Sequence, residues 1–596
     1  MLTSTTIAAV AAGLLGAALI FRRRRGWAPA DRILLALLPV FGLLFAVKVV
    51  QCLHDAQFQA WNDVRLAPTF GLTRGYGLYS RPHSGPIQST MYTPFSALSY
   101  LPATLAREPR VAMKLGGALA LLYYFAPILA LFRGLAGRSR LLAWYAFFGF
   151  ATITFAVPDS ISGLSYSATH IHSDAPALGL AMAACATMVL AGRGGVPGDR
   201  SALLAALLAW LALWSKQVML PTLVVLQLWA WLAHGPRFCA RFLALNCAVG
   251  LLTSATFAGI FGVEGMAHNA VGVPGKFPWL PFTSPNFPGQ AVWVGGFPAN
   301  LLGCSFALLN KSAFFLLVIA AHVLDRLTRA APARPRDWFA ANGWALPVLA
   351  GLASIPLSAA GAVKVGGYTN SESPTLYFLA GGFLAMIVQG TGRATARAGL
   401  IALAGLVVGM AWEAQSRPYD LNVVLLCVVA YSALLHAVDR ADDGPAGFAR
   451  SLLAALAVAA ASATAQEVAG TSIRLDAAPA YDRQHNFSRL AFEYARSHPR
   501  RAYFPMNPLA HLLTEGKLYH FLGSVHEWEF AKIPVDPAHL RAHLPPDFEV
   551  VCYPNAPTMY NDLLNRFLPE YSEPVAIPGL PNFKCYKKPS PPGPRP

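Results

Sequence analysis

The sequence predicts an all-α polytopic membrane protein of about 13 to 14 transmembrane helices, followed by a small C-terminal extracytoplasmic α/β domain. Of its 596 residues, 55% are hydrophobic and only 13% are charged, and the mean hydropathy is +0.44. Ordinary soluble domains do not have this composition. Apolar stretches of roughly 20 residues, the length that crosses a bilayer as a helix, recur along most of the chain.

Short loops that carry arginine, glycine or proline separate these apolar stretches. We therefore expect membrane spans at 4–21, 32–53, 111–132, 141–157, 174–192, 201–215, 217–233, 242–262, 300–323, 338–361, 375–391, 398–413, 420–437 and 451–467.

The net charge of +17 reflects the orientation of the protein in the membrane and does not indicate a nucleic-acid partner. Every second connection between spans is rich in arginine, and these connections hold 20 arginines together, from the run Arg22 to Arg25 up to Arg440 and Arg450. The positive-inside tendency places this side in the cytoplasm. The N-terminus, the loop 54–110 and the C-terminal tail are then outside.

The sequence divides into four regions. Residues 1–31 hold an extra N-terminal span and an Arg-rich cytoplasmic loop; the span lacks a basic segment before it, so we expect an uncleaved anchor. Residues 32–467 form the main membrane region, with large external loops at 54–110 and 263–299. Residues 468–588 mix strand-like and helix-like runs and predict a periplasmic α/β domain. Residues 589–596, ending in "PPGPRP", are expected to be disordered.

Cys552 and Cys585 are the two cysteines of the external domain. An oxidising compartment favours a disulfide between them, while two buried thiols are the alternative. The sequence has no CxxC motif and no metal-ligand spacing, so it specifies no cofactor and no metal ligands, although a divalent cation remains an open alternative.

The first group of candidate site residues lies where an early span ends and the first external loop begins. His54 and Asp55 follow the apolar run, Asp63 follows eight positions later, and Tyr92 lies further along the loop in "MYTP". The alternative is that Asp55 is only a solvated helix end. On these residues alone, the alternative is the stronger interpretation.

Three further external connections carry polar clusters. The first holds His170, His172 and Asp174, although Asp174 could equally cap the helix that follows. The second holds Lys216 and Gln217 between two short spans, where we expect a buried and unpaired ammonium. The third holds Lys364 and Asn370 in "VKVGGYTN", which could also be a plain loop. All these clusters fall on one predicted side of the membrane, as a reaction between a membrane-held phosphate ester and an external acceptor requires.

The order of these motifs resembles that of the GT-C superfamily of integral-membrane glycosyltransferases. The motifs are an acid at the end of an early span, "YxP" in the first loop, "SDAPALxL" opening a later span, "WSKQ" at a helix break and "GGYTN" in a late loop. The chain is similar to bacterial relatives of the dolichyl-phosphate-mannose protein mannosyltransferases and to the lipid A aminoarabinose transferase. The family often has two adjacent acids at the first position, where this chain has His54 and Asp55.

The resemblance implies inverting transfer of a sugar from a polyprenyl-phosphate-linked donor to a saccharide, lipid or protein acceptor in cell-envelope biosynthesis. It implies catalytic roles for Asp55, as general base, and for Asp174. It implies binding of the donor phosphate or substrate by His54, Tyr92, His170, His172, Lys216, Gln217, Lys364 and Asn370. The protein would lie in the bacterial inner membrane with its active site facing the periplasm.

Two alternatives to a transferase stay open. A transporter or flippase of a lipid-linked saccharide also places charges in the membrane, but usually near its midplane and in symmetric halves. A non-catalytic scaffold would leave the intramembrane Lys216 unexplained. The sequence identifies neither the sugar, the lipid carrier nor the acceptor.

Overall fold

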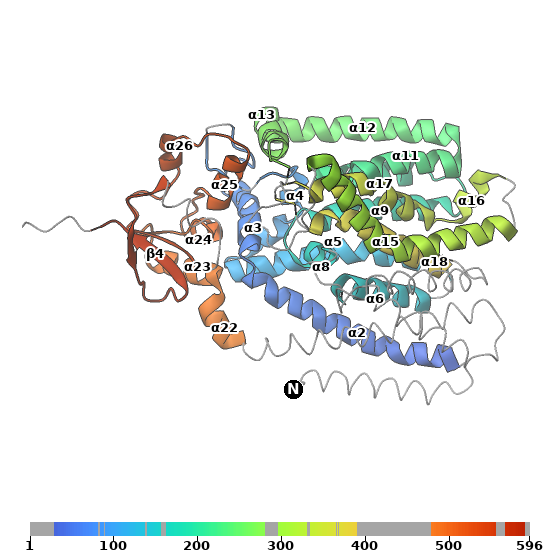
Figure 1. Ribbon diagram of the computed structural model, residues 1–596, viewed down its shortest axis with the longest axis horizontal. Coiled ribbons are helices and arrows are strands. Elements are labelled where there is room, and N and C mark those ends of the chain that lie inside the picture. Colours follow the sequence, from blue (N-terminus) through green and yellow to red (C-terminus); the bar gives the residue numbers. More distant parts are fainter. Residues whose placement is uncertain are drawn as a thin grey trace, which may run out of the picture.

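The computed structural model describes residues 29–81, 84–88, 90–137, 140–156, 163–279, 296–329, 334–364, 366–367, 369–389, 478–555 and 567–589. These residues form a bundle of long helices with a smaller domain of short helices and strands at one end (Figure 1). The expected spans at 4–21, 398–413, 420–437 and 451–467 lie outside the described residues, as do residues 590–596 of the tail.

Every other expected span overlaps a helix of the bundle, which confirms the polytopic helical architecture for the described part of the chain. These helices are α2 (Pro29–Asp55), α5 (Pro109–Leu135), α6 (Arg140–Ala156), α9 (Asp174–Gly192), α10 (Asp199–Leu213), α11 (Leu220–His234), α12 (Pro236–Phe261), α15 (Gly296–Arg329), α17 (Ala345–Ala362) and α18 (Ser373–Gln389).

By length and composition, five helical segments of the described residues can each cross a membrane. They are Pro109–Leu135, Asp174–Gly192, Gln217–His234, Pro236–Phe261 and Ala345–Ala362. α15 is a sixth candidate if its two parts, which meet at 63°, count as one span. The described helices thus agree with a multi-pass membrane protein.

Small residues let the helices of the bundle approach closely, as is usual in membranes. A Cβ atom on Gly179 of α9 would lie 1.9 Å from the carbonyl oxygen of Tyr123 on α5, so only glycine fits there. Gly134 of α5 meets Leu190 of α9 in the same way, at 2.1 Å. α9 is therefore held rigidly against α5, which fixes the position of Asp174 at its N-terminal end.

One expected span has different bounds. The sequence predicts a single helix over 338–361, but α16 (Pro335–Ala341) ends before Asn342, and α17 begins only at Ala345. Gly343, in the break, lies so close to α9 that a Cβ atom there would be 2.4 Å from Val189. The chain turns where the absence of a side chain permits this contact.

In the described part of the chain, two pairs of the arginine-bearing connections are in contact. Arg193, after α9, donates to the carbonyl oxygen of Gly134 near the end of α5, and Arg336 of α16 donates to the carbonyl of Ala233 on α11 at 3.4 Å. The sequence had grouped these connections on one side. In the structure, these contacts bring the connection after α9 to the end of α5, and α16 to the end of α11.

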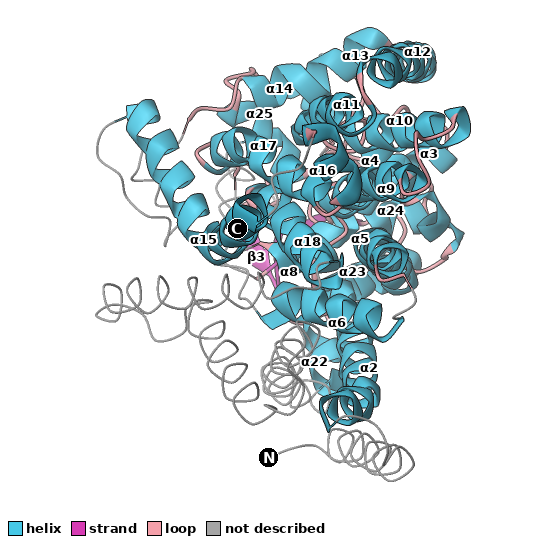
Figure 2. Ribbon diagram, turned by 90° about the vertical axis from the view of Figure 1, so that its right-hand side faces the viewer, coloured by secondary structure: helices cyan, strands magenta, loops and turns pink. Residues whose placement is uncertain are grey.

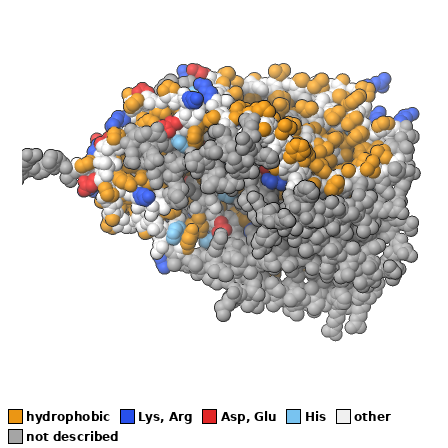
Figure 3. All heavy atoms as spheres, viewed as in Figure 1, with side chains coloured by type: hydrophobic (Ala, Val, Ile, Leu, Met, Phe, Trp, Pro, Cys, Tyr) orange, Lys and Arg blue, Asp and Glu red, His pale blue; other side chains and the backbone are white. Residues whose placement is uncertain are grey.

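Hydrophobic side chains cover much of the bundle surface, whereas charged side chains are frequent over the C-terminal domain (Figure 3). Leu251 and Leu252 of α12 are 73% and 69% exposed. Figure 2 views the bundle from the end remote from the C-terminal domain and shows α12 and α15 at its periphery. Such an apolar exterior is the surface that a helical protein presents to lipid.

The C-terminal domain contains a four-stranded sheet in the order β1-β2-β4-β3, which confirms the predicted α/β character. β1 is parallel to β2, and the other pairs are antiparallel. Short helices surround it. The elements are α22 (Ala478–His485), α23 (Phe487–Ser497), β1 (Ala502–Tyr503), α24 (Pro508–Thr514), α25 (Leu522–Phe530), α26 (Pro537–Ala542), β2 (Val550–Pro554), β3 (Glu573–Val575) and β4 (Phe583–Lys587).

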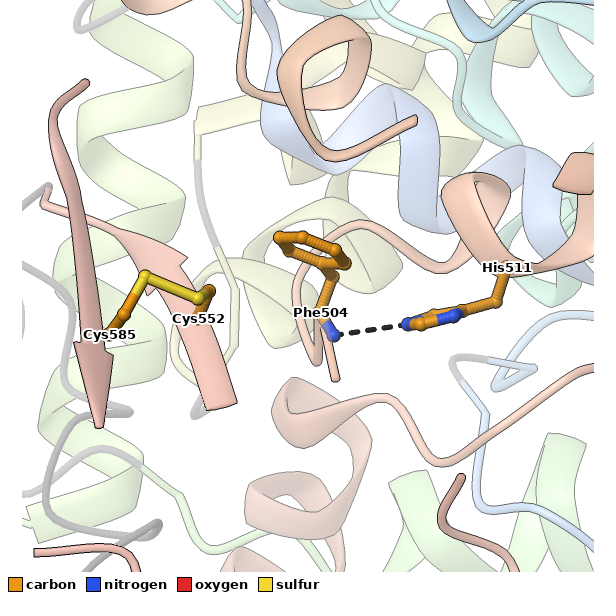
Figure 4. The surroundings of a disulfide bond; sticks show 4 residues. All are labelled: Phe504, His511, Cys552 and Cys585. Carbon is orange, nitrogen blue, oxygen red and sulfur yellow. Dashed lines mark hydrogen bonds between the residues drawn. A yellow bond between two sulfur atoms is a disulfide. The ribbon is translucent and has the colours of Figure 1, made fainter. Parts of the chain in front are cut away.

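The predicted disulfide between Cys552 and Cys585 is present (Figure 4). The two cysteines lie directly opposite each other on β2 and β4, and their Cα atoms are 4.2 Å apart. Both side chains are buried among Ala491, Phe504 and their neighbours. The bond closes a loop of the chain inside the small core of this domain.

The C-terminal domain packs on the external loops of the bundle. α3 (Ala60–Thr73), which follows α2 after one turn, contacts α24. Ile87 of the first external loop and Val273 of the second share a buried cluster with Val525 and Trp528 of α25. α13 (Val263–Ala267), a π-helical turn at His268–Gly272 and α14 (Val273–Gly275) make up the described part of that second loop. The domain thus covers the end of the bundle at which the candidate residues gather.

Candidate active site

Asp174 is the centre of a buried polar cluster built from three of the predicted motifs. Its side chain is 1% exposed. Lys216 donates to its Oδ1, His172 Nδ1 lies 2.6 Å from its Oδ2, and Asn370 donates to Oδ2 at 2.7 Å. Three segments far apart in the sequence therefore meet on one carboxylate.

Lys216 reaches Asp174 because the helical path is interrupted between α10 and α11. Lys216 has an extended backbone, with φ −153° and ψ 127°, and a short 3₁₀ turn follows it at Gln217–Met219. The sequence correctly predicts that this lysine is buried, since its residue exposure is 8%. The expectation that its ammonium is unpaired is wrong, because Lys216 forms an ion pair with Asp174.

A hydrogen-bonded chain leads from Asp174 to the first external loop. His172 Nε2 lies 2.8 Å from the hydroxyl of Tyr92. The carbonyl of His172 accepts from the hydroxyl of Tyr100 at 2.8 Å. With Nδ1–H donating to the carboxylate, Nε2 is left to accept from Tyr92, so Asp174 sets the tautomer of the imidazole.

His172 is held neutral by its surroundings. Burial, and then the neighbouring Arg65 guanidinium, lower the pKa of His172 to about 3, against the raising effect of Asp174. His170 differs in its partners: its ring stacks on Tyr166 at 4.0 Å between centroids. Burial lowers the pKa of His170 to about 4. Of the two histidines, His172 is the one that contacts the acid.

Arg65 is the functional candidate that sequence reasoning missed. Its guanidinium lies 5.6 Å from the centroid of the Tyr92 ring and also 5.6 Å from that of Trp61. Its Nε and Nη1 atoms are buried and have no hydrogen-bond partner within the described part of the chain. Such donors are costly to leave unpaired, so they indicate a missing acceptor.

A small cavity, partly open to solvent, lies beside Arg65. Its wall also contains polar groups of the cluster and of the loop that leads to it: Tyr79, Thr90, Tyr92, Ser96, Tyr100, His172 and Ser173. The cavity is therefore lined by hydroxyl and imidazole groups next to a cation. This lining suits an anionic, hydroxyl-rich ligand.

Backbone contacts fix the two walls of the cavity relative to each other. Asn62 on α3 accepts from the backbone N–H of Ile171 at 2.9 Å and donates to the carbonyl of Ala56 at 2.9 Å. Tyr79 donates its hydroxyl to the carbonyl of Tyr92 at 2.6 Å. The loop 163–173, the turn after α2 and the first external loop are thereby tied together around Arg65.

Gln217 and Lys364 contact the second external loop. Gln217 donates to the carbonyl of Ala270 in the π-helical turn at 2.8 Å, and the ammonium of Lys364 lies 5.0 Å from the centroid of the Trp279 ring. Burial lowers the pKa of Lys364. Both predicted residues thus lie where the late loop and the break between α10 and α11 meet the loop 263–279.

His54 and Asp55 end α2 and belong to a second group of charges. The Gln57 side chain lies 3.2 Å from His54 Nδ1, and the charges that act on this imidazole come from Asp55, Lys114, Asp482 and Arg110. Burial lowers the pKa of His54. The charges that act on His172 come instead from Arg65, Asp174 and Lys216. Asp55 therefore lies at the end of α2, as expected. The charged groups around it differ from those around Asp174.

Asp63, the competitor for the role of general base, anchors the C-terminal domain. Its side chain is fully buried and accepts from the backbone N–H of Leu509 at 2.9 Å, in the first turn of α24. Burial raises the pKa of Asp63 to about 7, although Ser488 and Asn507 beside it act in the opposite direction. This carboxyl faces the domain interface, whereas Arg65, two positions later, faces the cavity.

Among the described residues, no group of three or more His, Cys, Asp or Glu is arranged to hold a metal ion.

Comparison with known proteins bears on the fold. No protein-family model matches the sequence, and a search of curated proteins finds no relative. The solved structures that match include ArnT from Cupriavidus metallidurans in the apo state, with a TM-score of 0.47, and the same protein bound to undecaprenyl phosphate, with a TM-score of 0.51. Each is 14% identical to this chain and covers 91% of it and 97% of its own length.

The second of these matches establishes a common architecture over nearly the whole of both chains, at an identity that speaks for the fold and not for the substrate. The resemblance to the aminoarabinose transferase, stated from short motifs, is confirmed at this level. The chain therefore shares the fold of ArnT, and its described helices agree with a multi-pass membrane protein.

Proposed function

We propose that the protein is an inverting glycosyltransferase that moves a sugar from a polyprenyl-phosphate-linked donor to an extracytoplasmic acceptor. One observation carries the proposal: the Arg65 guanidinium presents two buried nitrogen atoms without a hydrogen-bond partner among the described residues, beside a cavity with polar and apolar walls. A phosphate oxygen in the cavity would accept from these donors. The planar fork of arginine matches the geometry of phosphate oxygens.

The remaining residues of the cavity suit a sugar. Tyr79, Tyr92 and Tyr100 line the wall with His172. Their hydroxyl protons go to protein acceptors, so their oxygens are left to accept from sugar hydroxyls. Departure of the lipid phosphate adds negative charge to its oxygens. The fixed positive charge of Arg65 would stabilise that change in the transition state.

The structural neighbour supports a lipid-phosphate donor. ArnT, which shares the fold over 97% of its length, was solved with undecaprenyl phosphate bound. A polyprenyl phosphate carries an anionic group that can accept hydrogen bonds from Arg65. Its hydrocarbon chain can lie in the surrounding bilayer. The donor proposed for this chain belongs to the same class of lipid.

Asp174 and Asp55 take different roles in this proposal. Three donors occupy the Asp174 carboxylate, so it holds Lys216 and His172 in place around the cavity. Asp55, at the rigid end of α2, is the proposed general base that accepts the proton of the attacking hydroxyl. Lys216 acts on the donor phosphate as an ammonium shared with Asp174.

We also propose that the site and the C-terminal domain face the periplasm. Contacts of Arg193 and Arg336 join described arginine-rich connections in pairs, and the positive-inside tendency assigns these connections to the cytoplasm. A cysteine introduced at Ser84 should react with an impermeant maleimide in intact cells, and one at Arg200 should not. The reverse pattern would move the active site to the cytoplasm.

Incubation of the purified protein with a labelled polyprenyl-phosphate-sugar tests the proposed reaction. A transferase releases the sugar to an acceptor or to water. A flippase, the alternative function, moves the intact donor across proteoliposome membranes and leaves the sugar bond unbroken. Recovery of the intact donor in both leaflets would overturn the proposal of a transferase. Recovery of the intact donor without movement between leaflets would indicate a protein that only binds the donor.

A further inference from the structure

Three histidines of the C-terminal domain form a compact triangle where this domain meets the first external loop. The ring centroids of His520 and His539 are 5.4 Å apart, those of His520 and His543 5.5 Å, and those of His539 and His543 5.4 Å. His520 and His539 are 2% and 8% exposed. Three imidazoles this close cannot all carry a charge without strong repulsion.

Two of the rings hold the backbone of the loop directly. The backbone N–H of Ile87 donates to His520 Nδ1 at 2.8 Å, and His539 Nε2 donates to the carbonyl of Gly85 at 2.7 Å. Ile87 itself is 2% exposed, and its carbonyl accepts from the backbone N–H of Phe521 at 2.9 Å. The loop is therefore docked by an alternating set of backbone and imidazole hydrogen bonds.

The hydrogen bonds define the protonation state of His520. A backbone N–H can only donate, so Nδ1 of His520 must carry a lone pair, and Nε2 carries the hydrogen that faces the carbonyl of His539 at 3.4 Å. Protonation would add a hydrogen to Nδ1, which would then oppose the N–H of Ile87. The docked loop and the charged imidazole exclude each other.

The docked segment leads to the candidate active site. Five residues after Ile87, Tyr92 lines the cavity and contacts His172. Thr90, between them, lies 3.5 Å from Asn269 of the π-helical turn. Residues 85–87 are therefore joined by only a few residues to Tyr92 in the wall of the cavity.

We propose that His520 is a positioning residue that holds Tyr92 in the cavity wall only while its ring is neutral, with His539 as a second tether of the same loop, so that acidification releases residues 84–92 and weakens donor binding. The step to Tyr92 rests on the proposed function. The release of the loop does not.

The electrostatic surroundings agree in sign. Burial, and then the neighbouring His539 and His543, lower the pKa of His520 to about 3. Burial and His539 also lower the pKa of His543. The other titratable groups on the packed elements have partners of their own: the Tyr503 hydroxyl donates to the carbonyl of His520, Arg541 pairs with Glu570, and His526 pairs with Glu529.

The expected effect follows from linkage. A released His520 titrates near its ordinary value of 6.5, while the docked ring titrates at about 3. Docking is fully favoured above pH 6.5 and is lost progressively as the pH falls from 6.5 towards 3. Between pH 7.5 and pH 5.0, one such group shifts the docking equilibrium by about 30-fold towards release.

Hydrogen–deuterium exchange of the full-length protein in detergent measures this release. After correction for the intrinsic pH dependence of exchange, peptides covering residues 84–92 should exchange about 30-fold faster at pH 5.0 than at pH 7.5. Equal protection at the two pH values would overturn the proposal. This readout stays valid even if the protein proves not to be a transferase.

The variant His520→Asn separates titration from structure, because the amide oxygen of asparagine can accept from Ile87 near the position of Nδ1 but takes up no proton. Its loop should stay protected at both pH values, while the exposed-site control His498→Asn should respond like the wild type. A pH response in His520→Asn equal to that of the wild type would refute the proposal. If this variant does not fold, His543→Asn, which leaves both loop bonds in place, should move the release to lower pH; an unchanged midpoint would refute it.

Binding of undecaprenyl phosphate connects the loop to the site. The wild type should lose affinity between pH 7.5 and pH 5.0 in parallel with the exchange of residues 84–92, and His520→Asn should keep its affinity. Faster exchange without loss of lipid binding would refute the link to Tyr92. Absence of lipid binding at both pH values, with normal exchange behaviour, would instead count against the proposed function.

Discussion

Removal of the Lys216 ammonium should cost far more stability than the loss of one surface charge. Asp174 is 1% exposed and the Lys216 side chain 10%. Breaking a buried ion pair by deleting one partner costs about 3–5 kcal/mol, because the other charge stays buried. His172 and Asn370 still contact Asp174, so we expect the lower end of this range for Lys216→Met, about 3 kcal/mol.

A double-mutant cycle measures the coupling itself. Lys216→Met, Asp174→Asn and the double variant are unfolded with SDS in mixed micelles, and intrinsic tryptophan fluorescence reports the transition. The double variant should be more stable than the sum of the single losses predicts, by about 2 kcal/mol or more. The exposed pair of Arg501 and Glu549, with side chains 61% and 64% exposed, serves as the control and should show a coupling below about 1 kcal/mol.

Additive losses within about 0.5 kcal/mol would refute the reasoning, because they would mean that Lys216 and Asp174 do not stabilise each other. The lysine would then be the unpaired cation that the sequence suggests. Its removal would be expected to weaken lipid-phosphate binding without a loss of stability.

Three further outcomes are expected. Asp55→Asn should lower sugar transfer by about 10²-fold to 10⁴-fold with donor binding intact, whereas Asp63→Asn should keep near-normal turnover; the opposite result would reassign the base. Cys552→Ser should destabilise the C-terminal domain by about 4 kcal/mol, from the 33-residue separation of the cysteines, and an unchanged melting temperature would contradict this. Because the pKa of Asp63 is raised to about 7, its contribution to stability is full below pH 3.8 and is lost as the pH rises to 7; Asp63→Asn should abolish this dependence in melting curves, and a persisting one would point to another group.

The sequence predicts the architecture well because membrane spans have a strong signal of their own. Length and apolar composition locate the spans that overlap described helices. The disulfide was equally accessible, because the external domain offers only Cys552 and Cys585. These features depend on local composition or on counting.

The site was predicted only in part, because its contacts join distant segments. Asp174 and Lys216 are 42 positions apart, and Asn370 lies 196 positions from Asp174. The sequence shows each as polar but not that they share one carboxylate. A cation that is near an acid in space but far from it in the chain looks unpaired in the sequence. The prediction of an unpaired Lys216 was wrong for this reason.

Arg65 was missed because α3 reads as an ordinary soluble helix. "WNDVRLAP" alternates charged and apolar residues, which usually indicates a solvated face. In the structure both polar faces are covered: Asp63 meets the C-terminal domain, and Arg65 meets the cavity. The available signal was that a short helix with two opposite charges directly follows the catalytic candidate Asp55.

The most direct test of the account is the affinity of Arg65→Gln for undecaprenyl phosphate, measured against Arg74→Gln. Arg74 ends the same helix but is exposed, so it controls for the loss of one positive charge. Charge-assisted hydrogen bonds contribute about 1.5–3 kcal/mol each. Arg65→Gln should therefore bind at least about 10-fold more weakly than the wild type, while Arg74→Gln should bind like it. Equal affinities of Arg65→Gln and the wild type, in a folded protein, would contradict the assignment of this cavity to the donor phosphate.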